Sequence, residues 1–527
     1  MAHSFKSTFL FICFGVIGLF LWCGLSNDHH WGGDFAAFIM QAQAVVDGTK
    51  KEFVETNRIT IEKSSHLLGP VTYPWGVPVL LAPFYAYFGM NILALKAVNV
   101  ICFLLFLLTL WFGFQRYHTG LWRVLLICLF AINPFFIPWI NQVTSDVPFL
   151  FFSTLAVILI GRVVIDKRWI ISEVSDHFLL GFILSLAFFV RTNGILLLLA
   201  LPISQLIRMG QEVLPAKKIN GNIMVILSEI LSQIRRKSLK EFCVVVLPYA
   251  SFVVTVSIWN TVFDDSGGHV INDQFIHDKS PSPFTILKEV SLGNIKSTLY
   301  GYIELTAQFF SAVPHSSIVF GASIPFAIGG MLKRSRSDYH MLVFGGMTVL
   351  LLIILPIGAH LRYSFPLFPI YISFVLTGLE TTLVINQGKW RGLHSVLLIG
   401  PLMVITLFFA TQMANDIYTN LTQGRIRVNM VGPYRQTSQD IFSFISTNTD
   451  SSSVILFYKP RVMRLFSHRQ SISVGANRLQ DGDYLCSYRH GYWQMGKKDI
   501  EKFVKDGILD LVYKNTDFKL YRIKKIQ

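Results

Sequence analysis

The chain has 527 residues, of which 52% are hydrophobic and only 15% are charged. A soluble domain carries about 25% charged residues, so this composition excludes a large soluble protein and indicates a membrane protein. The formal net charge of +15 fits orientation signals in the loops of such a protein, and we expect no nucleic-acid partner.

Long apolar segments recur along the chain and predict an all-α polytopic membrane protein with about eleven transmembrane helices. The first segment follows Lys6 and is longer than the apolar region of a secretory signal, so we interpret it as an uncleaved helix. The segment 75–89 is apolar but contains prolines, which favours a shorter helix at the membrane interface. The expected spans are 5–25, 92–115, 122–140, 147–165, 177–191, 193–208, 242–262, 308–332, 339–357, 364–385 and 393–413.

Basic residues gather in alternate loops between these spans, as one consistent cytoplasmic side requires. Such clusters occur at Arg116 and Arg123, at Arg334 and Arg336, and within 208–240. The positive-inside rule therefore predicts a cytoplasmic N-terminus and, with an odd number of spans, an extracytoplasmic C-terminus. We expect an integral multi-pass protein of the plasma or inner membrane, in contact with membrane lipids.

The polar mass of the chain lies on the expected outer side. It comprises loop 26–74 and a loop from Phe263 to about Tyr302, which both belong to a transmembrane domain at 1–413, and a tail at 414–527. The tail alternates helical spacing with short apolar strand patterns, which predicts a small C-terminal extracytoplasmic α/β domain. Helices are expected at Gln439–Ser446 and Asp499–Lys505, and strands at Val454–Tyr458, Ser471–Val474, Asp483–Cys486, Ile508–Tyr513 and Lys519–Ile523.

Two aspartates on the expected outer side are candidates for acid–base chemistry. Asp34 follows the first span in Trp31-Gly32-Gly33-Asp34-Phe35, and Asp146 precedes the fourth in Thr144-Ser145-Asp146-Val147-Pro148. A carboxylate at the membrane surface can take a proton from a substrate hydroxyl presented there. The simpler alternative is that Asp34 caps a helix beginning at Phe35 and that Asp146 lies in the first turn of another helix.

Arg191 and Arg362 are basic residues in short outer loops, where the positive-inside rule disfavours them. A cation in such a place usually has a specific anionic partner, and arginine binds a lipid phosphate through paired hydrogen bonds. The simpler alternative is contact with lipid headgroups, or a salt bridge to Asp34 or Asp146. Further candidates for binding the lipid phosphate are Lys63, His66 and Tyr363.

The sequence shows no clear metal site. Its six cysteines have neither a CxxC spacing nor a disulfide framework. His29 and His30 precede Asp34, but adjacent histidines rarely bind one ion together. The sequence therefore names no certain cofactor and leaves a divalent metal open.

Five motifs in the outer loops and at the starts of spans form a recognisable set. They are Gly33-Asp34-Phe35, Tyr73-Pro74-Trp75-Gly76-Val77-Pro78, Ala94-Leu95-Lys96-Ala97-Val98-Asn99, Thr144-Ser145-Asp146-Val147-Pro148-Phe149 and Arg362-Tyr363-Ser364-Phe365-Pro366-Leu367-Phe368-Pro369. Together they resemble the GT-C superfamily of membrane glycosyltransferases, which includes the protein O-mannosyltransferases and the lipid A aminoarabinose transferase. Phe35 departs from the Asp-Glu pair of many protein O-mannosyltransferases, which argues against a protein-mannosylating activity.

The resemblance implies transfer of a hexose or pentose from a polyprenyl-phosphate donor to a glycan, lipid or protein acceptor on the outer face. Asp34 would be the base, supported by Asp146, and direct displacement predicts inversion at the anomeric carbon. Arg191 and Arg362 would bind the lipid phosphate. The alternatives are an O-antigen ligase or polymerase-like enzyme, a polytopic transporter and a non-catalytic assembly subunit. A transporter is disfavoured because it would place its ionisable residues near the bilayer midplane.

Overall fold

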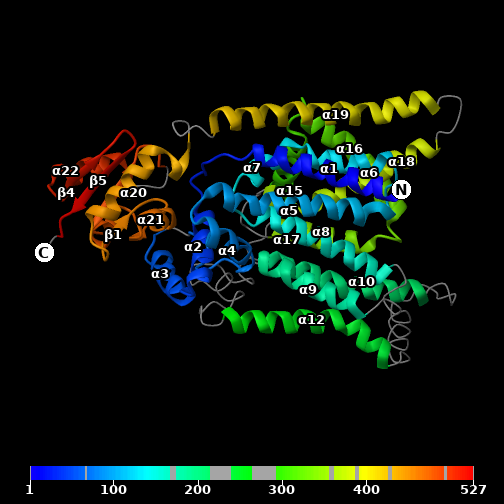
Figure 1. The fold of residues 1–527 in the computed structure, drawn as a ribbon, viewed down its shortest axis with the longest axis horizontal. Coiled ribbons are helices and arrows are strands. Elements are labelled where there is room, and N and C mark those ends of the chain that lie inside the picture. Colours follow the sequence, from blue (N-terminus) through cyan, green and yellow to red (C-terminus); the bar gives the residue numbers. More distant parts are fainter. Residues whose placement is uncertain are drawn as a thin grey trace.

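The computed structural model describes residues 2–65, 68–165, 174–213, 239–263, 292–354, 361–385, 391–424, 430–491 and 495–525. A bundle of long helices occupies one end of the molecule and a smaller α/β domain the other (Figure 1). The N-terminus lies at the end of the bundle far from the α/β domain, and the C-terminus lies within that domain (Figure 1).

Within the described ranges, eight helices are long and apolar enough to cross a membrane. Three other expected spans carry shorter apolar segments, namely Ile12–Cys23 of α1 (Ala2–Cys23), α9 (Val174–Val190) and α17 (Tyr339–Ile354). The prediction of a polytopic helical membrane protein is therefore confirmed. The eight spans lie on α5 (Ile92–Gly113), α6 (Leu121–Ala131) with α7 (Ile137–Ile140), α8 (Asp146–Ile160) with the π-helical turn that follows it to Ile165, α10 (Ile195–Val213), α12 (Leu239–Phe263), α16 (Ser316–Arg334), α18 (Leu367–Ile385) and α19 (Arg391–Thr419).

Two helices outside these spans differ in how well the sequence predicted them. Helix α4 (Gly76–Phe88) has 13 residues, too few to cross a bilayer, in line with the expected short helix. Helix α15 (Leu292–Ala307) was missed, because the expected outer loop extended to about Tyr302. Its apolar residues have helical spacing, but Gly293 and Lys296 weaken that pattern.

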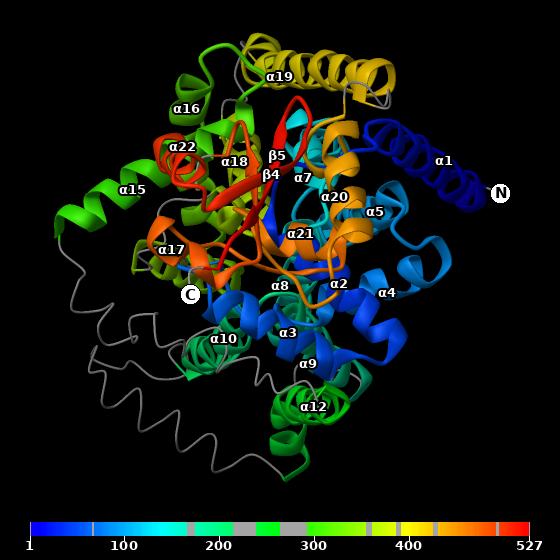
Figure 2. The same ribbon diagram turned by 90° about the vertical axis from the view of Figure 1, so that its left-hand side faces the viewer.

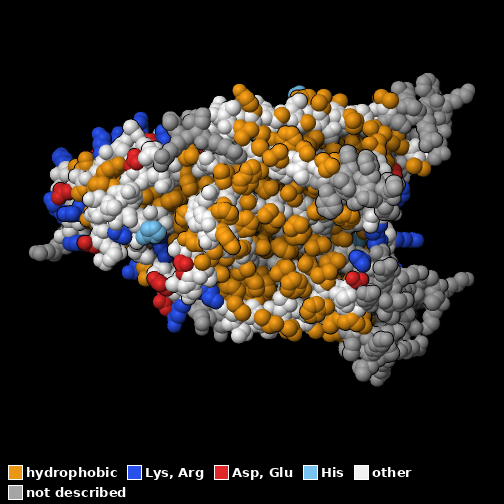
Figure 3. Space-filling view, in the orientation of Figure 1, with side chains coloured by type: hydrophobic (Ala, Val, Ile, Leu, Met, Phe, Trp, Pro, Cys, Tyr) orange, Lys and Arg blue, Asp and Glu red, His pale blue; other side chains and the backbone are white. Residues whose placement is uncertain are grey.

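The surface of the bundle carries a belt of hydrophobic side chains, and Lys and Arg side chains gather beyond it at the end far from the α/β domain (Figure 3). At that end Arg334 Nε lies 2.5 Å from Asp338 Oδ2, and Arg116 Nη2 lies 3.9 Å from Asp338 Oδ1. The α/β domain instead shows charged side chains of both signs (Figure 3). Which end of the bundle faces the cytoplasm stays a prediction from the loop charges.

The first long loop, 26–74, contains two helices, α2 (Gly33–Asp47) and α3 (Lys50–Glu62). They lie between the bundle and the α/β domain, with α4 beside α2 (Figure 1). Because the loop is helical, its backbone hydrogen bonds are satisfied locally and its side chains hold fixed positions at the end of the bundle.

The α/β domain contains one sheet of five strands in the order β2-β1-β3-β5-β4. Strand β1 pairs in parallel with β2 and β3, whereas β5 pairs antiparallel with β3 and β4. The expected strands and both expected helices of the tail are present, with shifted ends. The elements are α20 (Gln436–Asn448), β1 (Val454–Leu456), α21 (Pro460–Ser467), β2 (Gln470–Ile472), β3 (Tyr484–Tyr488), α22 (Lys497–Lys505), β4 (Leu509–Lys514) and β5 (Phe518–Ile523).

Two features of the tail differ from expectation. Helix α19 reaches Thr419 and continues as a π-helical turn to Gly424, so it passes through the boundary expected between residues 413 and 414. Helix α21 was not predicted, because its eight residues are too few to display a clear period.

The α/β domain is docked tightly on the first loop through Trp31. Its ring is surrounded by five aromatic rings of the domain, with ring centroids 5.4–6.3 Å away. Viewed from the domain end, α20 and α21 overlie the region of α2 (Figure 2), and α21 contacts α2 directly. Such aromatic packing buries a large apolar area, so the domain and the loop form one unit. The rings around Trp31 are Phe442, Phe457, Tyr458, Tyr488 and Phe518.

Candidate active site

Asp34 lies in the first turn of α2, and its carboxylate is directed away from the helix backbone. The Tyr73 hydroxyl donates a hydrogen bond of 2.6 Å to Oδ1, and Arg362 Nη1 donates one of 3.3 Å to Oδ2. The N-cap of α2 is Gly32, without a side-chain cap. The capping alternative for Asp34 is therefore wrong, and α2 begins at Gly33 rather than at Phe35.

Tyr73 is held in place by the next turns of α2. The Gln41 side chain donates to the Tyr73 carbonyl at 2.9 Å and accepts from the Tyr73 N–H at 3.1 Å. The Phe38 and Tyr73 rings have their centroids 4.8 Å apart. Because Asp34, Phe38 and Gln41 share one face of α2, that face fixes both the carboxylate and the hydroxyl that contacts it.

The surroundings of Asp34 keep it ionised. Burial acts to raise the pKa of Asp34, but the Tyr73 hydrogen bond and the charges of Arg362 and Arg461 outweigh it and leave this pKa below its ordinary value. Burial and the adjacent charge of Asp34 raise the pKa of the Tyr73 hydroxyl. Tyr73 therefore remains a proton donor to the carboxylate.

The second candidate acid, Asp146, begins α8 and forms a buried ion pair. Arg191 Nη1 lies 2.6 Å from Asp146 Oδ1, and the two side chains are 13% and 1% exposed. The alternative in which Arg191 forms a salt bridge to Asp146 is therefore confirmed. The other carboxylate oxygen of Asp146, Oδ2, is buried and has no hydrogen-bond partner in the described part of the chain.

Tyr363 connects this ion pair to Asp34. Its ring centroid lies 4.9 Å from the Arg191 guanidinium and 5.2 Å from that of Arg362, which places the ring within cation–π reach of both. Burial acts to lower the pKa of Arg362, but the charges of Asp146 and of the Tyr363 and Asp34 groups raise it. Two carboxylates and two guanidinium groups from four separate segments therefore form one polar network.

Arg461 joins the network from α21, a helix that sequence reasoning did not find. Its guanidinium is almost fully buried, with Nη1 3.4 Å from the Tyr73 hydroxyl and Nη2 bonded to the Pro70 carbonyl. The preceding Lys459 is half-buried and within electrostatic range of Asp34. No spacing in the sequence relates these residues to loop 26–74, so only the fold reveals them.

Two of the expected phosphate-binding residues do not contribute to this arrangement. Lys63 is exposed at the C-terminal end of α3, and its side chain makes none of the contacts that define the network. His66 lies outside the described residues. Tyr363, by contrast, lies at the centre of the network, between the two guanidinium groups.

His29 has a structural role that explains its position before Asp34. Its Nε2 accepts a hydrogen bond of 3.1 Å from the Val143 N–H, and its Nδ1 lies 2.9 Å from the His30 carbonyl. This pattern requires a neutral ring protonated on Nδ1, and burial lowers the pKa of His29 to about 3. His29 thus joins the loop of Asp34 to the loop that precedes Asp146.

Lys96 strengthens the same junction. Its buried ammonium donates to the carbonyls of Ser26 and Asp28, at 2.8 and 2.5 Å, and to the Asn141 side chain at 2.8 Å. A buried charge is stable only when it is fully hydrogen-bonded. Lys96 therefore fixes the start of the first loop against the segment that leads to Asp146.

A divalent metal at the site stays a prediction. Among the described residues, no three His, Cys, Asp or Glu side chains form a group that could hold an ion. Both ring nitrogens of His29 are engaged by the protein, and Asp34 and Asp146 are each paired with an arginine.

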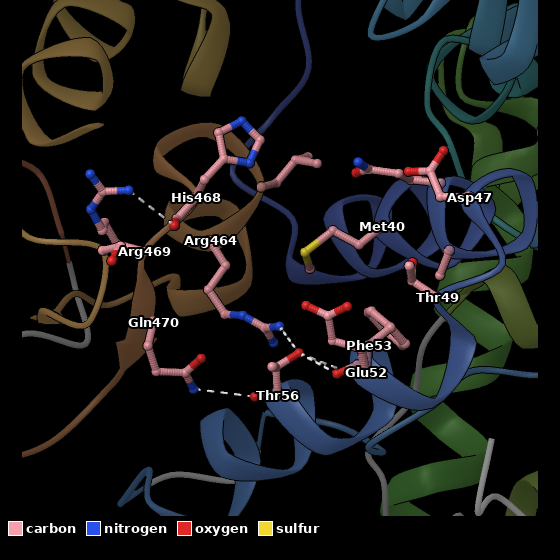
Figure 4. Close-up of a pocket in the computed structure, with 14 residues that line it drawn as sticks. Met40, Asp47, Thr49, Glu52, Phe53, Thr56, Arg464, His468, Arg469 and Gln470 are labelled. Carbon is pink, nitrogen blue, oxygen red and sulfur yellow. Dashed lines mark hydrogen bonds between the residues drawn. The ribbon is translucent and has the colours of Figure 1, made fainter. Parts of the chain in front are cut away.

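A groove with a volume of about 570 Å³ lies between α2 and α3 on one side and α21 and β2 on the other (Figure 4). Arg464 reaches across it and donates to the Thr56 hydroxyl at 2.7 Å (Figure 4). The groove is separate from the network, because its lining contains neither the two carboxylates nor the arginines that pair with them. Its lining includes Met40, Asp47, Glu52, Arg464, His468 and Gln470.

Comparison of the sequence with family models and with curated proteins finds no match. Solved structures do match it. ArnT from Cupriavidus metallidurans bound to undecaprenyl phosphate superposes with a TM-score of 0.56 and 11% sequence identity, over 98% of each chain. The archaeal oligosaccharyltransferase AglB from Archaeoglobus fulgidus, in complex with an inhibitory peptide and a dolichol-phosphate, gives a TM-score of 0.51 and 11% identity. That match covers 92% of this chain and 70% of AglB.

The chain has the GT-C fold. The match to ArnT spans the bundle and the α/β domain alike, because it covers nearly the whole of both chains. The fold expected from the resemblance of the outer-loop motifs is thereby confirmed. At 11% identity the similarity establishes the architecture, and a shared fold does not by itself determine the chemistry.

Proposed function

We propose that this protein is an inverting glycosyltransferase that transfers a sugar from a polyprenyl-phosphate donor to an acceptor at the end of the bundle that bears the α/β domain. The observation that carries the proposal is the network in which Asp34 and Asp146 meet Arg362 and Arg191. Structures of the same fold bound to undecaprenyl phosphate and to dolichol-phosphate support the class of donor.

In the proposed reaction the acceptor hydroxyl attacks the anomeric carbon of the donor sugar. The bond from that carbon to the phosphate oxygen breaks, and the electron pair leaves with the polyprenyl phosphate. Asp34 takes the hydroxyl proton. A carboxylate has about four lone-pair positions, of which Tyr73 and Arg362 use two, and the Asp34 side chain is 35% exposed. Room for a third hydrogen bond therefore remains.

Two unsatisfied polar atoms in the network indicate where substrate groups bind. The Nε of Arg362 is a buried donor without a partner among the described residues, and a phosphate oxygen would satisfy it. The Oδ2 of Asp146 is a buried acceptor in the same situation, and a sugar hydroxyl would satisfy it. Arg362 would then bind the donor phosphate while Asp146 orients the sugar ring.

The proposed chemistry uses guanidinium groups rather than a divalent metal to balance charge. Each carboxylate of the network already has an arginine partner, at 2.6 Å for Asp146 and 3.3 Å for Asp34. We also propose that the site faces the extracytoplasmic side, with the N-terminus in the cytoplasm, because the basic loop residues gather at the opposite end of the bundle.

The proposal is tested with purified protein in nanodiscs and a panel of polyprenyl-phosphate hexoses and pentoses, each offered with a total glycolipid and glycoprotein extract as acceptor. Mass spectrometry follows released polyprenyl phosphate and a sugar-sized mass increase in the acceptor. We expect both products with one member of the panel, and neither with Asp34→Asn. Release of no polyprenyl phosphate by the wild-type protein from any donor would reject the proposal.

A further inference from the structure

The segment from Tyr458 to Arg461 extends from the α/β domain onto the loop of Asp34. At one end of the segment the Tyr458 ring packs against Trp31, with centroids 5.5 Å apart. At the other end Arg461 Nη1 lies 3.4 Å from the hydroxyl of Tyr73, which in turn contacts Asp34. Lys459 lies between these two anchored residues, so its backbone is fixed beside the candidate base.

The ammonium group of Lys459 has no dedicated partner in the described part of the chain. It is half-buried, and no carboxylate or carbonyl forms a hydrogen bond or ion pair with it there. Burial lowers the pKa of Lys459, and the negative charge of Asp34 offsets part of this effect. A half-buried cation without a partner is costly to maintain for structural reasons alone, whereas an anionic ligand would stabilise it.

The balance of charges around the site also favours an anionic ligand beside Lys459. Among the described residues, the contacts of Arg191, Arg362, Lys459 and Arg461 involve two carboxylates, Asp34 and Asp146. Two positive charges are therefore left over when substrate is absent. A polyprenyl-phosphate sugar is a phosphodiester with about one negative charge, whereas the departing phosphate monoester carries about 1.5 to 2 at neutral pH. The excess charge thus matches the leaving group better than it matches the donor.

We propose that Lys459, supplied by the α/β domain, contacts the phosphate of the donor and neutralises the charge that develops on it as the sugar departs. The inference rests on the proposed function and names the part of the domain that takes part in the reaction. A cation that interacts more strongly with the leaving group than with the bound donor accelerates the chemical step rather than tightening donor binding.

The test compares Lys459→Gln with Lys459→Arg and with Lys498→Gln, which removes an exposed lysine of the same domain. We expect Lys459→Gln to lower kcat by about 10- to 100-fold and to change the donor KM much less. Inhibition by added polyprenyl phosphate should weaken at the same time. Lys459→Arg should keep most of the activity, and Lys498→Gln should match wild type. Thermal unfolding of each variant shows whether the fold is intact.

A kcat of Lys459→Gln within about twofold of wild type would overturn the inference. So would a loss of kcat that Lys459→Arg does not restore, since a charge in the same place would then be insufficient. Direct titration of the purified variants with undecaprenyl phosphate distinguishes failure of the Lys459 inference from failure of the proposed function, because binding can be measured without turnover. Weaker binding to Lys459→Gln than to Lys498→Gln supports the role of Lys459, and equal binding rejects it.

Discussion

The hydroxyl of Tyr73 lies 2.6 Å from Oδ1 of Asp34, and Gln41 holds the Tyr73 backbone against the same helix that carries the carboxylate. This contact joins the two ends of the first long loop, 26–74, at one point. It also lowers the pKa of Asp34 against the opposing effect of burial. The state of the proposed base therefore depends on a residue 39 positions away in the sequence.

Replacing Tyr73 by Phe should raise the pKa of Asp34. The carboxylate is the active form, so activity is present above this pKa and is lost as the pH falls through it. In wild type this loss of activity should occur at a pH below 3.8, the ordinary pKa of an aspartate. Without the hydroxyl, the acidic limb of kcat/KM should move to higher pH by about one unit. A pH profile of the variant measures the shift, and Tyr87→Phe, at a residue 88% exposed, is the control. A limb that stays in place would show that Asp34 is not the group that titrates.

Asp34→Asn should abolish transfer while the fold survives. The amide keeps an oxygen for the Tyr73 hydroxyl but cannot take a proton, so we expect a loss of about 100- to 10,000-fold in kcat. Glu55→Gln removes an exposed carboxylate of α3 and should leave activity unchanged. Release of polyprenyl phosphate is the measurement. Turnover by Asp34→Asn at the wild-type rate would refute the assignment of the base.

Arg362→Ala should weaken binding of the lipid donor, by about tenfold or more, because a charge-assisted contact to phosphate is lost. Arg362→Lys should recover only part of this affinity, since an ammonium lacks the planar pair of donors. Equilibrium binding of undecaprenyl phosphate in nanodiscs measures both variants. If Arg362→Ala binds the lipid as tightly as wild type, Arg362 does not capture the phosphate.

The buried pair of Asp146 and Arg191 should show strong coupling. Removing one partner leaves the other charge without compensation, which we expect to cost about 3–5 kcal/mol of stability. The double variant Asp146→Ala/Arg191→Ala should be less destabilised than the sum of the single variants. Thermal unfolding of the four proteins in one detergent gives the coupling. Additive effects would mean that the 2.6 Å contact contributes little.

Chelation should leave activity intact. Both carboxylates of the network are paired with arginine, and His29 uses both ring nitrogens within the protein. We therefore expect full transfer after prolonged treatment with EDTA and no gain from added Mg²⁺ or Mn²⁺. Elemental analysis of the treated protein verifies that metal is absent. A loss of activity that Mg²⁺ or Mn²⁺ restores would require a different account of charge balance at Asp34.

The membrane-spanning architecture could be predicted from the sequence because a bilayer demands long apolar helices. Asp34, Arg191 and Arg362 could be selected for a related reason, since each is a charged residue at a place where hydropathy and the positive-inside rule do not require one. The strands of the tail were also predictable, because short apolar runs separated by polar turns are typical of a sheet.

The contribution of the α/β domain could not be predicted. The contact between Arg461 and Tyr73 joins residues 388 positions apart, and no local pattern encodes such a pairing. Helix α21 has only eight residues, so its period is invisible in the sequence. The partner of each arginine was equally undetermined, because both Asp34 and Asp146 were available and only the packed loops assign Arg362 to one and Arg191 to the other.

The docking of Trp31 among the aromatic rings of the α/β domain has a consequence for biosynthesis. Phe518, one of those rings, follows Asp34 by 484 residues in the sequence. A ribosome must therefore add all the residues up to Phe518 before Asp34 acquires its complete surroundings. Nascent and prematurely terminated chains would carry the base without its neighbours, so partly made copies should not consume the lipid-linked sugar.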